Sequence, residues 1–128
     1  MLIARELRNT RVRQSRGALR PSKNSYCPLG VIASMLFEDK EWQRSDGSKI
    51  YFRRSMYSIR GETQFLPREV MEWSGIRTSD GRIEGMYRQM PERSVLQQVP
   101  ESIVHLNDKR RLSFSEIADL IEEHWEKL

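Results

Sequence analysis

Arginine is the side chain whose number and spacing carry most of the chemistry in this chain of 128 residues. Seventeen arginines stand against five lysines. A guanidinium group offers a planar fork of donors that matches a phosphate or a carboxylate, whereas an ammonium group does not. Residues 1–25 hold seven cations and one acid, Glu6, which gives this segment a formal charge of +6 in a chain of +4. The segment therefore predicts an anionic partner.

Part of this basic segment fits an extended arm that forms one wall of an anion site. Arg11, Arg13 and Arg16 suit a strand, in which alternate residues share a face. Such an arm can follow a phosphate backbone, and aromatic residues such as Tyr26 can stack on a base, although aromatics in a small domain mostly belong to the core. The expected ligand contacts are Arg11, Arg13, Arg16, Arg20, Arg53, Arg54, Arg60, Tyr26, Asn107, Lys109, Arg110 and Arg111.

Cys27 and His105 are the residues that point to catalysis. Cys27 stands directly before Pro28, at the expected start of a helix, where a thiol has a lowered pKa and is more nucleophilic. A cysteine, a later histidine and a following polar residue, Asn107, appear in the order of papain-like enzymes. A lone cysteine is more often inert packing, so the prediction is a protein without enzymatic activity, with a cysteine-dependent enzyme as a distant alternative.

Metal and cofactor chemistry are disfavoured by the residue types. The soft or imidazole ligands are Cys27, His105 and His124, whereas a structural zinc site needs four such ligands at close spacings. The sequence also lacks a glycine-rich phosphate loop. We therefore expect neither a metal nor a cofactor.

Length and composition bound the class of protein. A chain of this length fits a single domain, residues 1–128, with a basic helix and arm over 1–25 and a long loop over 84–100. Apolar residues make up 38% and charged residues 31%, which is typical of a polar globular chain. There is no apolar run of the ~18 residues that a membrane helix needs, no signal peptide, and a single cysteine. These features predict a cytoplasmic protein without a membrane partner.

Two helices lie at the ends of the chain. Ser113 and Glu116 form a capping box, and apolar residues then recur every three or four positions, which predicts a helix over 114–127. A short N-terminal helix carries Arg5 and Arg8 on one side. Because the last helix is acidic, two copies of the chain can also meet basic face to acidic face, which allows a homo-oligomer.

The middle of the chain mixes helices with short strands. Pro28 and Pro67 suit the first turn of a helix, because a missing amide hydrogen is harmless there, and Gly75 supplies the end of the second of these helices. The pieces do not alternate regularly, so we expect an α+β fold of three to four helices packed on a short antiparallel sheet. The expected strands and turns are Met56–Ile59, Thr63–Phe65, Ile103–Leu106, Asp46–Gly47, Asp80–Gly81 and Asn107–Asp108.

The order of several short motifs resembles a group of small, uncharacterised bacteriophage proteins. The motifs are Cys-x-Leu-Gly-Val, Leu-Pro…Val…Trp-x-Gly and Leu-Asn-Asp…Phe-x-Glu-Ile-Ala-Asp, and the resemblance covers nearly the whole chain. It implies a phage or prophage origin, but it carries no reaction and no catalytic residue. The matching residues are Gln14, Gly17, Leu19, Arg20, Cys27, Leu29, Gly30, Val31, Leu66, Pro67, Val70, Trp73, Gly75, Ile76, Leu106, Asn107, Asp108, Phe114, Glu116, Ile117, Ala118 and Asp119.

Together these observations predict a non-enzymatic phage accessory protein that counters host defence in the host cytoplasm by binding and sequestering a partner. The expected partner is an anionic nucleotide signal or an acidic host protein. The alternative is a DNA- or RNA-binding protein that uses the basic N-terminal arm, although a net charge of +4 is modest for that role.

Overall fold

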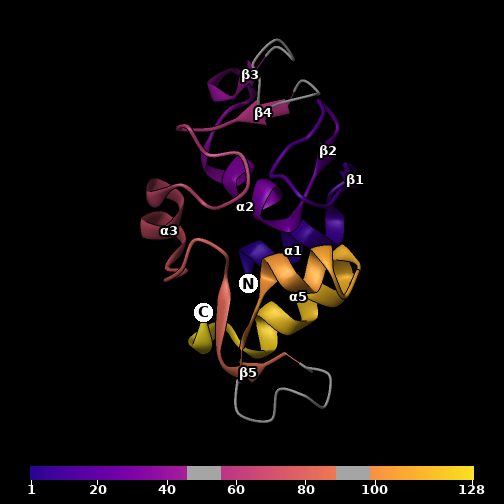
Figure 1. The fold of residues 1–128 in the computed structure, drawn as a ribbon, viewed down its shortest axis with the longest axis vertical. Helices are drawn as coiled ribbons and strands as arrows, with labels where there is room; N and C mark the ends of the chain where they lie inside the picture. Colours follow the sequence, from indigo (N-terminus) through magenta and orange to yellow (C-terminus); the bar gives the residue numbers. More distant parts are fainter. Residues whose placement is uncertain (46–55, 89–98) are drawn as a thin grey trace.

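The computed structural model describes residues 1–45, 56–88 and 99–128. The described residues form a small α+β domain, which confirms the expected fold class (Figure 1). The helices are α1 (Leu2–Asn9), α2 (Pro28–Leu36), α3 (Arg68–Ser74), α4 (Ile103–Asp108) and α5 (Phe114–Glu123), with 3-10 turns η1 (Asp39–Glu41) and η3 (Trp125–Lys127). The strands are β1 (Arg13–Gln14), β2 (Ser25–Tyr26), β3 (Gln43–Ser45), β4 (Met56–Ser58), β5 (Arg82–Tyr87) and β6 (Pro100–Ser102).

The strands pair two by two instead of forming one antiparallel sheet. In the described residues β3 pairs with β4 and β5 with β6 in antiparallel fashion, whereas β1 and β2 run parallel, with Arg13 opposite Ser25. Two-stranded pairs of this length are marginal on their own and depend on packing against other elements. The helices therefore provide the main scaffold, and the strands connect them.

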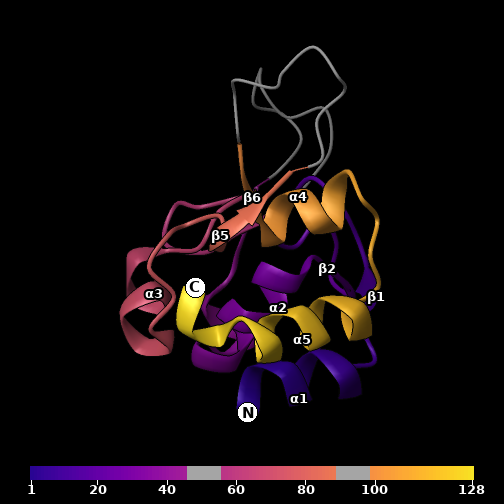
Figure 2. The same cartoon turned by 90° about the horizontal axis from the view of Figure 1, so that it is seen from below.

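The basic N-terminal helix lies against the acidic C-terminal helix. α1 runs alongside α5 in both ribbon views (Figures 1 and 2). Ile3 and Leu7 of α1 and Ile117 of α5 are buried. Arg8 donates to Asp119 at 2.7 Å and to Glu122 at 3.0 Å. Part of the charge asymmetry along the sequence is thus neutralised within one chain.

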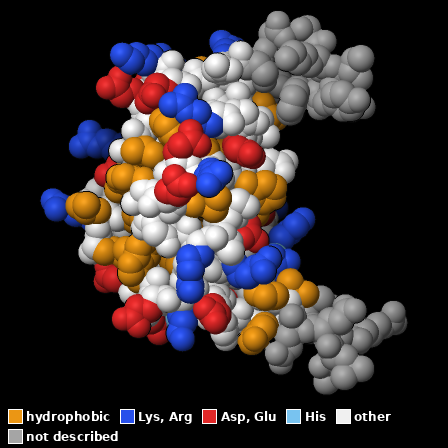
Figure 3. Space-filling model, turned by 90° about the vertical axis from the view of Figure 1, so that its left-hand side faces the viewer, with side chains coloured by type: hydrophobic (Ala, Val, Ile, Leu, Met, Phe, Trp, Pro, Cys, Tyr) orange, Lys and Arg blue, Asp and Glu red, His pale blue; other side chains and the backbone are white. Residues whose placement is uncertain are grey.

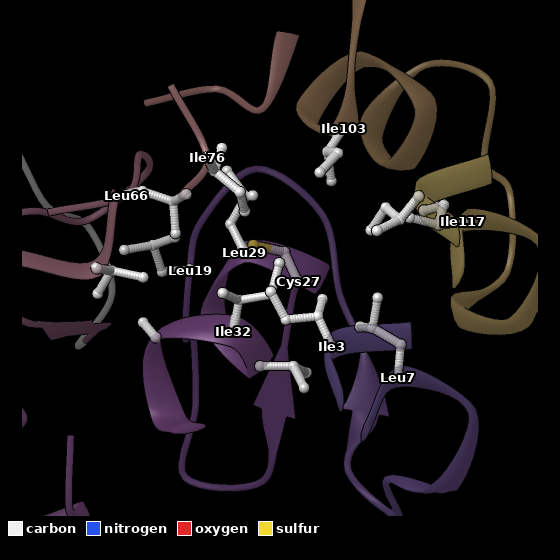
Figure 4. Close-up of a cluster of buried hydrophobic side chains, with 14 of the residues drawn as sticks. Ile3, Leu7, Leu19, Cys27, Leu29, Ile32, Leu66, Ile76, Ile103 and Ile117 are labelled. Carbon is white, nitrogen blue, oxygen red and sulfur yellow. The ribbon is translucent and has the colours of Figure 1, made fainter. Parts of the chain in front are cut away.

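The core is built around α2, which contacts α1, α3 and α4. Every residue from Pro28 to Ala33 is buried, because neighbouring elements cover most sides of this helix. Figure 4 shows Cys27, Leu29 and Ile32 among buried aliphatic side chains from other helices, such as Ile3 and Ile117, and from the segments between them, such as Leu66. A helix that is apolar around most of its circumference is expected to be central, as the sequence predicts.

The start of α2 depends on a close approach between backbones. Cys27 is the N-cap, and its sulfur accepts a hydrogen bond from the Gly30 amide at 3.4 Å, while its own amide donates to the Leu19 carbonyl at 3.0 Å. A Cβ atom on Gly30 would lie 2.0 Å from that carbonyl oxygen. The cysteine and the glycine of the Cys-x-Leu-Gly motif therefore have structural roles.

The predicted start and end of α3 and the predicted start of α5 are confirmed. α3 follows Pro67 and ends at Gly75, whose φ of 85° places it in the left-handed region. Before α5, the Ser113 hydroxyl accepts from the Glu116 amide at 3.1 Å, and the Glu116 carboxylate accepts from the Ser113 amide at 3.0 Å. α5 ends at Glu123, earlier than residue 127, and continues as the turn η3.

The expected strand over Ile103–Leu106 is wrong, because these residues belong to α4. The Ser102 hydroxyl accepts from the His105 amide at 3.1 Å and caps the helix. Ile103, Leu106 and Asn107 are buried at helical spacing. Burial of one helical face outweighs the local preference of β-branched residues for strands. Asn107 and Asp108 therefore lie in the last helical turn and do not form a separate turn.

Part of the expected long loop over 84–100 belongs to strands instead. β5 reaches Tyr87 and β6 begins at Pro100, while residues 89–98 lie outside the described residues. The β5–β6 register shifts between Ile83 and Tyr87, and Gly85 lies between them with a φ of 81°. Such a bulge interrupts the alternation by which a strand is recognised in a sequence.

The remaining strand and turn predictions have mixed outcomes. A strand at Met56–Ser58 is confirmed as β4, and a turn at Asp80–Gly81 is confirmed by the bond from the Gly81 amide to the Thr78 carbonyl. Thr63–Phe65 is in no strand. The turn expected at Asp46–Gly47 lies outside the described residues.

Candidate anion-binding site

Many of the arginines are neutralised by carboxylates of the same chain. On the face of the molecule in Figure 3, basic and acidic side chains are interspersed and form no large patch of one sign. Most of these pairs are exposed and contribute little stability, but all of them reduce the charge left for a partner. The pairs within the described residues are Arg8 with Asp119 and Glu122, Arg20 with Asp39, Arg60 with Glu41 and Glu69, Arg68 with Glu72, Arg77 with Glu84, and Arg88 and Arg110 with Glu101.

Three cations without such a partner line one hollow on the surface. Arg11, Arg13 and Lys23 border an open hollow of about 550 Å³, together with Ser22, Asn24 and Ser25. No acid is among the described residues that line it, and none of the three cations forms an ion pair with a described carboxylate. These six residues are called the basic hollow. Its positive charge is not cancelled locally, so it attracts anions.

The geometry of β1 explains why Arg13 faces this hollow. Neighbouring residues in a strand point to opposite sides. Gln14 points toward the end of α4, where its amide nitrogen donates to the Asn107 side chain at 2.8 Å and to the Leu112 carbonyl at 2.7 Å. Arg13 therefore points to the other side, toward the hollow that Arg11, two residues before it, also lines. The Arg13 amide donates to the Asn24 carbonyl at 2.8 Å, which holds the opposite wall in place.

Arg20, an expected ligand contact, lies in the interior. Its side chain is 2% exposed, and its guanidinium carbon lies 4.9 Å from the Tyr26 ring centre, 5.5 Å from Trp42 and 4.3 Å from Tyr57. It donates to the Asp39 carboxylate at 2.6 Å and to the Lys23 carbonyl at 3.0 Å. Arg20 thus fixes the backbone of Lys23, which lines the basic hollow, without lining the hollow itself. Tyr26 is buried in the same cluster.

Arg16, the next arginine in the sequence after Arg13, is hydrogen-bonded to the end of α4. The Arg16 guanidinium donates to the Asn107 carbonyl at 2.9 Å, and the Asn107 amide group donates to the Ser15 carbonyl at 2.9 Å. Asn107 is buried, and its hydrogen bonds connect the end of α4 to the segment that holds Ser15 and Arg16. Lys109 and Arg111 follow it and form no ion pair with a described carboxylate. The structure therefore brings Arg16 into contact with Asn107, two residues before Lys109.

Arg60, another expected ligand contact, does not extend this surface. Arg60 links η1 to α3 through Glu41 at 3.4 Å and Glu69 at 2.9 Å, and it does not line the basic hollow. Arg53 and Arg54 lie outside the described residues.

The thiol of Cys27 lies where it cannot act as a nucleophile at neutral pH. Burial raises its pKa to about 12, which outweighs the lowering by the backbone amides of Gly30 and Leu29. The expectation of a lowered pKa is therefore wrong, since removal from water disfavours the charged form more than the helix start favours it. His105 binds the Glu101 carboxylate through Nδ1 at 2.7 Å and is not among the residues around the small cavity beside Cys27.

Glu101 is a charged residue that the sequence reasoning missed. Its side chain is fully buried, and Oε1 accepts from the Ser102 amide at 3.0 Å as well as contacting His105. Arg88 and Arg110 lie 3.9 and 3.8 Å from its carboxylate. The spacing of four residues between Glu101 and His105 is the signal that could have indicated this pair. Glu101 joins the β5–β6 pair to α4.

Neither a metal cluster nor a membrane-spanning helix is present in the part of the chain that the structure describes. No group of three or more His, Cys, Asp or Glu side chains is placed there to hold a metal ion. Among the same residues no helix has the length and apolar character needed to cross a membrane.

Comparisons with known proteins identify the family of the chain. No curated protein matches it, and no solved structure matches it. The model of one family, described as a domain of unknown function (DUF8296), matches residues 3–125. The match runs from α1 into the turn after α5 and so includes the basic hollow, the Arg20 cluster and the Glu101 cluster. The chain therefore belongs to the DUF8296 family.

Proposed function

We propose that the protein is a non-enzymatic binding protein that sequesters an anionic partner, with the basic hollow as the contact surface. The observation that carries this proposal is the contrast between two sets of cations. Seven arginines of the described residues are paired with carboxylates, whereas Arg11, Arg13 and Lys23 border one hollow without such a partner. Cations left unpaired around a concavity are available to an external anion.

A nucleotide signal fits this hollow better than an acidic protein does. The hollow is concave, and Ser22 and Ser25 add hydroxyl groups that can bind phosphate oxygens beside the guanidinium groups. A stable protein interface covers about 800 Å² on each partner, which is a much larger surface than these six residues provide. A nucleotide is therefore the partner that we propose, and binding of an acidic host protein in its place is an alternative outcome of the test.

A DNA- or RNA-binding role is the second candidate, and one feature favours it. Arg11, Arg13 and Arg16 follow one another along the chain, and Arg16 binds the Asn107 carbonyl at the end of α4, two residues before Lys109. A series of cations along an extended chain can contact successive phosphates of a nucleic acid.

The biological setting that we propose is a bacteriophage infection. The resemblance to small phage proteins supports a phage or prophage origin, and a binding protein without catalytic machinery suits the removal of a host defence signal in the host cytoplasm. This part of the proposal rests on analogy with other small phage proteins.

The test of sequestration is retention of an unchanged ligand. The protein is incubated with a mixture of cyclic mononucleotides, cyclic dinucleotides and linear nucleotides, separated from free ligand and denatured, and the released molecules are identified by mass spectrometry. We expect at least one nucleotide to be released intact. Chemical conversion of the nucleotide would argue for an enzyme, and no retention of any nucleotide would remove the nucleotide proposal.

Matched variants locate the binding surface. The double substitution Arg11→Gln with Arg13→Gln should abolish retention. The control is Arg5→Gln with Arg82→Gln, which removes the same charge from exposed arginines that form no ion pair with a described carboxylate. Equal loss in both double variants would show that net charge matters and that the basic hollow does not.

A further inference from the structure

We infer that the basic hollow recognises phosphate groups and does not read the nucleobase, so that its ligands form the class of multiply phosphorylated molecules. This inference rests on the proposed function and specifies the ligand of the same site. It follows from which side chains line the hollow, and from what the nearby aromatic rings already contact.

The lining of the hollow contains no ring on which a base can stack. The described residues around it are three cations, two serines and one asparagine. Stacking on an aromatic side chain is the usual way in which proteins hold a nucleobase. The lysine and the two arginines offer donors alone, and such a set of cationic donors suits the oxygen atoms of phosphate, which are acceptors.

The aromatic residues expected to stack on a base are occupied by Arg20. Its guanidinium carbon lies 4.3 Å from the Tyr57 ring centre and 4.9 Å from that of Tyr26. Tyr26 is 8% exposed and Trp42 is 6% exposed. A base could stack there only by displacing a buried cation that also binds Asp39 and the Lys23 carbonyl. The ring cluster therefore supports the hollow from behind and offers no face to a ligand.

Among the uncharged lining residues, one carries an amide that can pair with the edge of a base. The Asn24 side chain carries both a donor and an acceptor, the combination with which asparagine recognises adenine. Asn24 is exposed and its side chain forms no hydrogen bond with another described residue, so nothing holds the amide in one orientation. A reader of base edges needs a fixed orientation, and we therefore assign Asn24 to phosphate or sugar contacts.

The selectivity of the site then depends on phosphoryl charge. Each added phosphate brings further oxygen atoms to Arg11, Arg13 and Lys23, whereas exchange of one base for another leaves these contacts unchanged. Affinity should rise with the number of phosphates and be insensitive to the base.

The experiment is a calorimetric titration of the full chain at one fixed salt concentration, with ATP, GTP, CTP, UTP, AMP, adenosine and inorganic tripolyphosphate as probes. The four triphosphates should bind with dissociation constants within about twofold of one another, because no contact distinguishes their bases. Tripolyphosphate should bind as well as they do, AMP about tenfold or more weakly, and adenosine not at all.

The outcomes separate this inference from the proposed function. A preference of about tenfold or more for one base, the size that a stacked or paired base produces, would overturn the inference and leave nucleotide sequestration standing. If that preference disappears in Asn24→Ala, Asn24 reads the base. Failure of tripolyphosphate to bind while nucleotides bind would also overturn the inference. If none of the probes binds, and none of the cyclic nucleotides is retained, both proposals fail.

Discussion

Arg11 and Arg20 have the same charge and lie nine positions apart, yet the fold gives them different roles. Arg20 is enclosed by three aromatic rings and bound to Asp39 and to a backbone carbonyl. Arg11 is exposed at the rim of the basic hollow. The guanidinium of Arg20 stabilises the turn that carries Lys23, and that of Arg11 is left for a ligand. A single ladder of arginines in the sequence therefore divides into structural and binding residues.

Replacement of Arg20 by lysine should destabilise the fold although it keeps the charge. An ammonium group lacks the planar fork that binds both the Lys23 carbonyl and Asp39, and it stacks less well between rings. We expect a loss of about 2 kcal/mol in the free energy of unfolding, measured by urea denaturation. The control is Arg60→Lys, whose side chain is 48% exposed and should change stability by less than about 0.5 kcal/mol. Equal losses of stability in the two variants would contradict a structural role for the enclosed Arg20 guanidinium.

The buried thiol of Cys27 should make stability depend on alkaline pH. Its pKa is about 12 in the folded protein against an ordinary 9.0. Above pH 9.0 the unfolded chain releases this proton and the folded chain keeps it until about pH 12, so rising pH favours unfolding across this window, and the full contribution is present below it. The expected slope is about 1.4 kcal/mol per pH unit.

The pH effect is measured by urea unfolding at several pH values between 8 and about 11. Cys27→Ser is the comparison, because serine keeps an acceptor for the Gly30 amide and does not titrate in this range. The parent protein should lose more stability than the variant as the pH rises. Parallel curves for the two proteins would mean that the thiol is accessible to water.

Helix α2 is the element that the rest of the fold is built around. Cys27 caps it, and the backbone at Leu19 crosses its first turn, so the segment after the arginine ladder is pinned to the core. The two residues that permit this crossing, Cys27 and Gly30, lie three positions apart. The hollow on the surface thus depends on an approach between backbones in the interior.

Gly30→Ala tests this approach through the sign of its effect. Helix propensity alone predicts a gain of about 1 kcal/mol, because glycine is a poor helix former. The added Cβ would lie 2.0 Å from the Leu19 carbonyl oxygen, a backbone atom that cannot rotate away. We therefore expect a loss of about 3 kcal/mol in denaturant unfolding. The exposed helical change Ser115→Ala is the control and should be neutral or slightly stabilising. A stabilised Gly30→Ala variant would contradict the close approach.

On the scale of the whole molecule, charge is distributed by the packing of the two ends of the chain. α1 brings Arg8 to the acids of α5, and β1 turns Gln14 to the end of α4 while Arg13 faces the other way. The excess positive charge of the chain, +4 in all, therefore lies mainly at cations that have no described acid near them. The basic hollow is such a place, and Lys109 and Arg111 are further candidates.

Salt dependence distinguishes a site confined to the hollow from one that runs along the ladder. For a short single-stranded oligonucleotide, each phosphate contact contributes about −0.7 to the slope of log K against log salt concentration. Three contacts in the hollow predict a slope of about −2, and further contacts from Arg16 and Lys109–Arg111 predict a slope beyond about −4. We expect the smaller slope, measured by fluorescence anisotropy, and a shallower one for Arg11→Gln with Arg13→Gln. A slope unchanged by that double substitution would place the contacts elsewhere.

The sequence by itself determined the features that depend on near neighbours. The α+β class, the caps at Ser113 and Gly75 and the start of α2 at Pro28 could be read directly, because each rests on hydrogen bonds between residues a few positions apart. The sequence did not predict α4, because its residues favour strands locally and become helical only when one face of the helix is buried. It did not predict β5, because a bulge interrupts the alternation of its residues. Both depend on contacts beyond the local segment.

Only the tertiary structure decided which charged side chains are paired within the chain and which are open to a ligand. Gln14 and Asn107 are separated by 93 positions, and Arg8 and Asp119 by 111, so no local pattern indicates that they meet. The same holds for Arg20, whose rings come from three separate strands and turns, and for Cys27, whose pKa is set by burial. Burial and pairing depend on which distant segments are packed together, and for this chain packing decides that Arg11, Arg13 and Lys23 remain open to an anion.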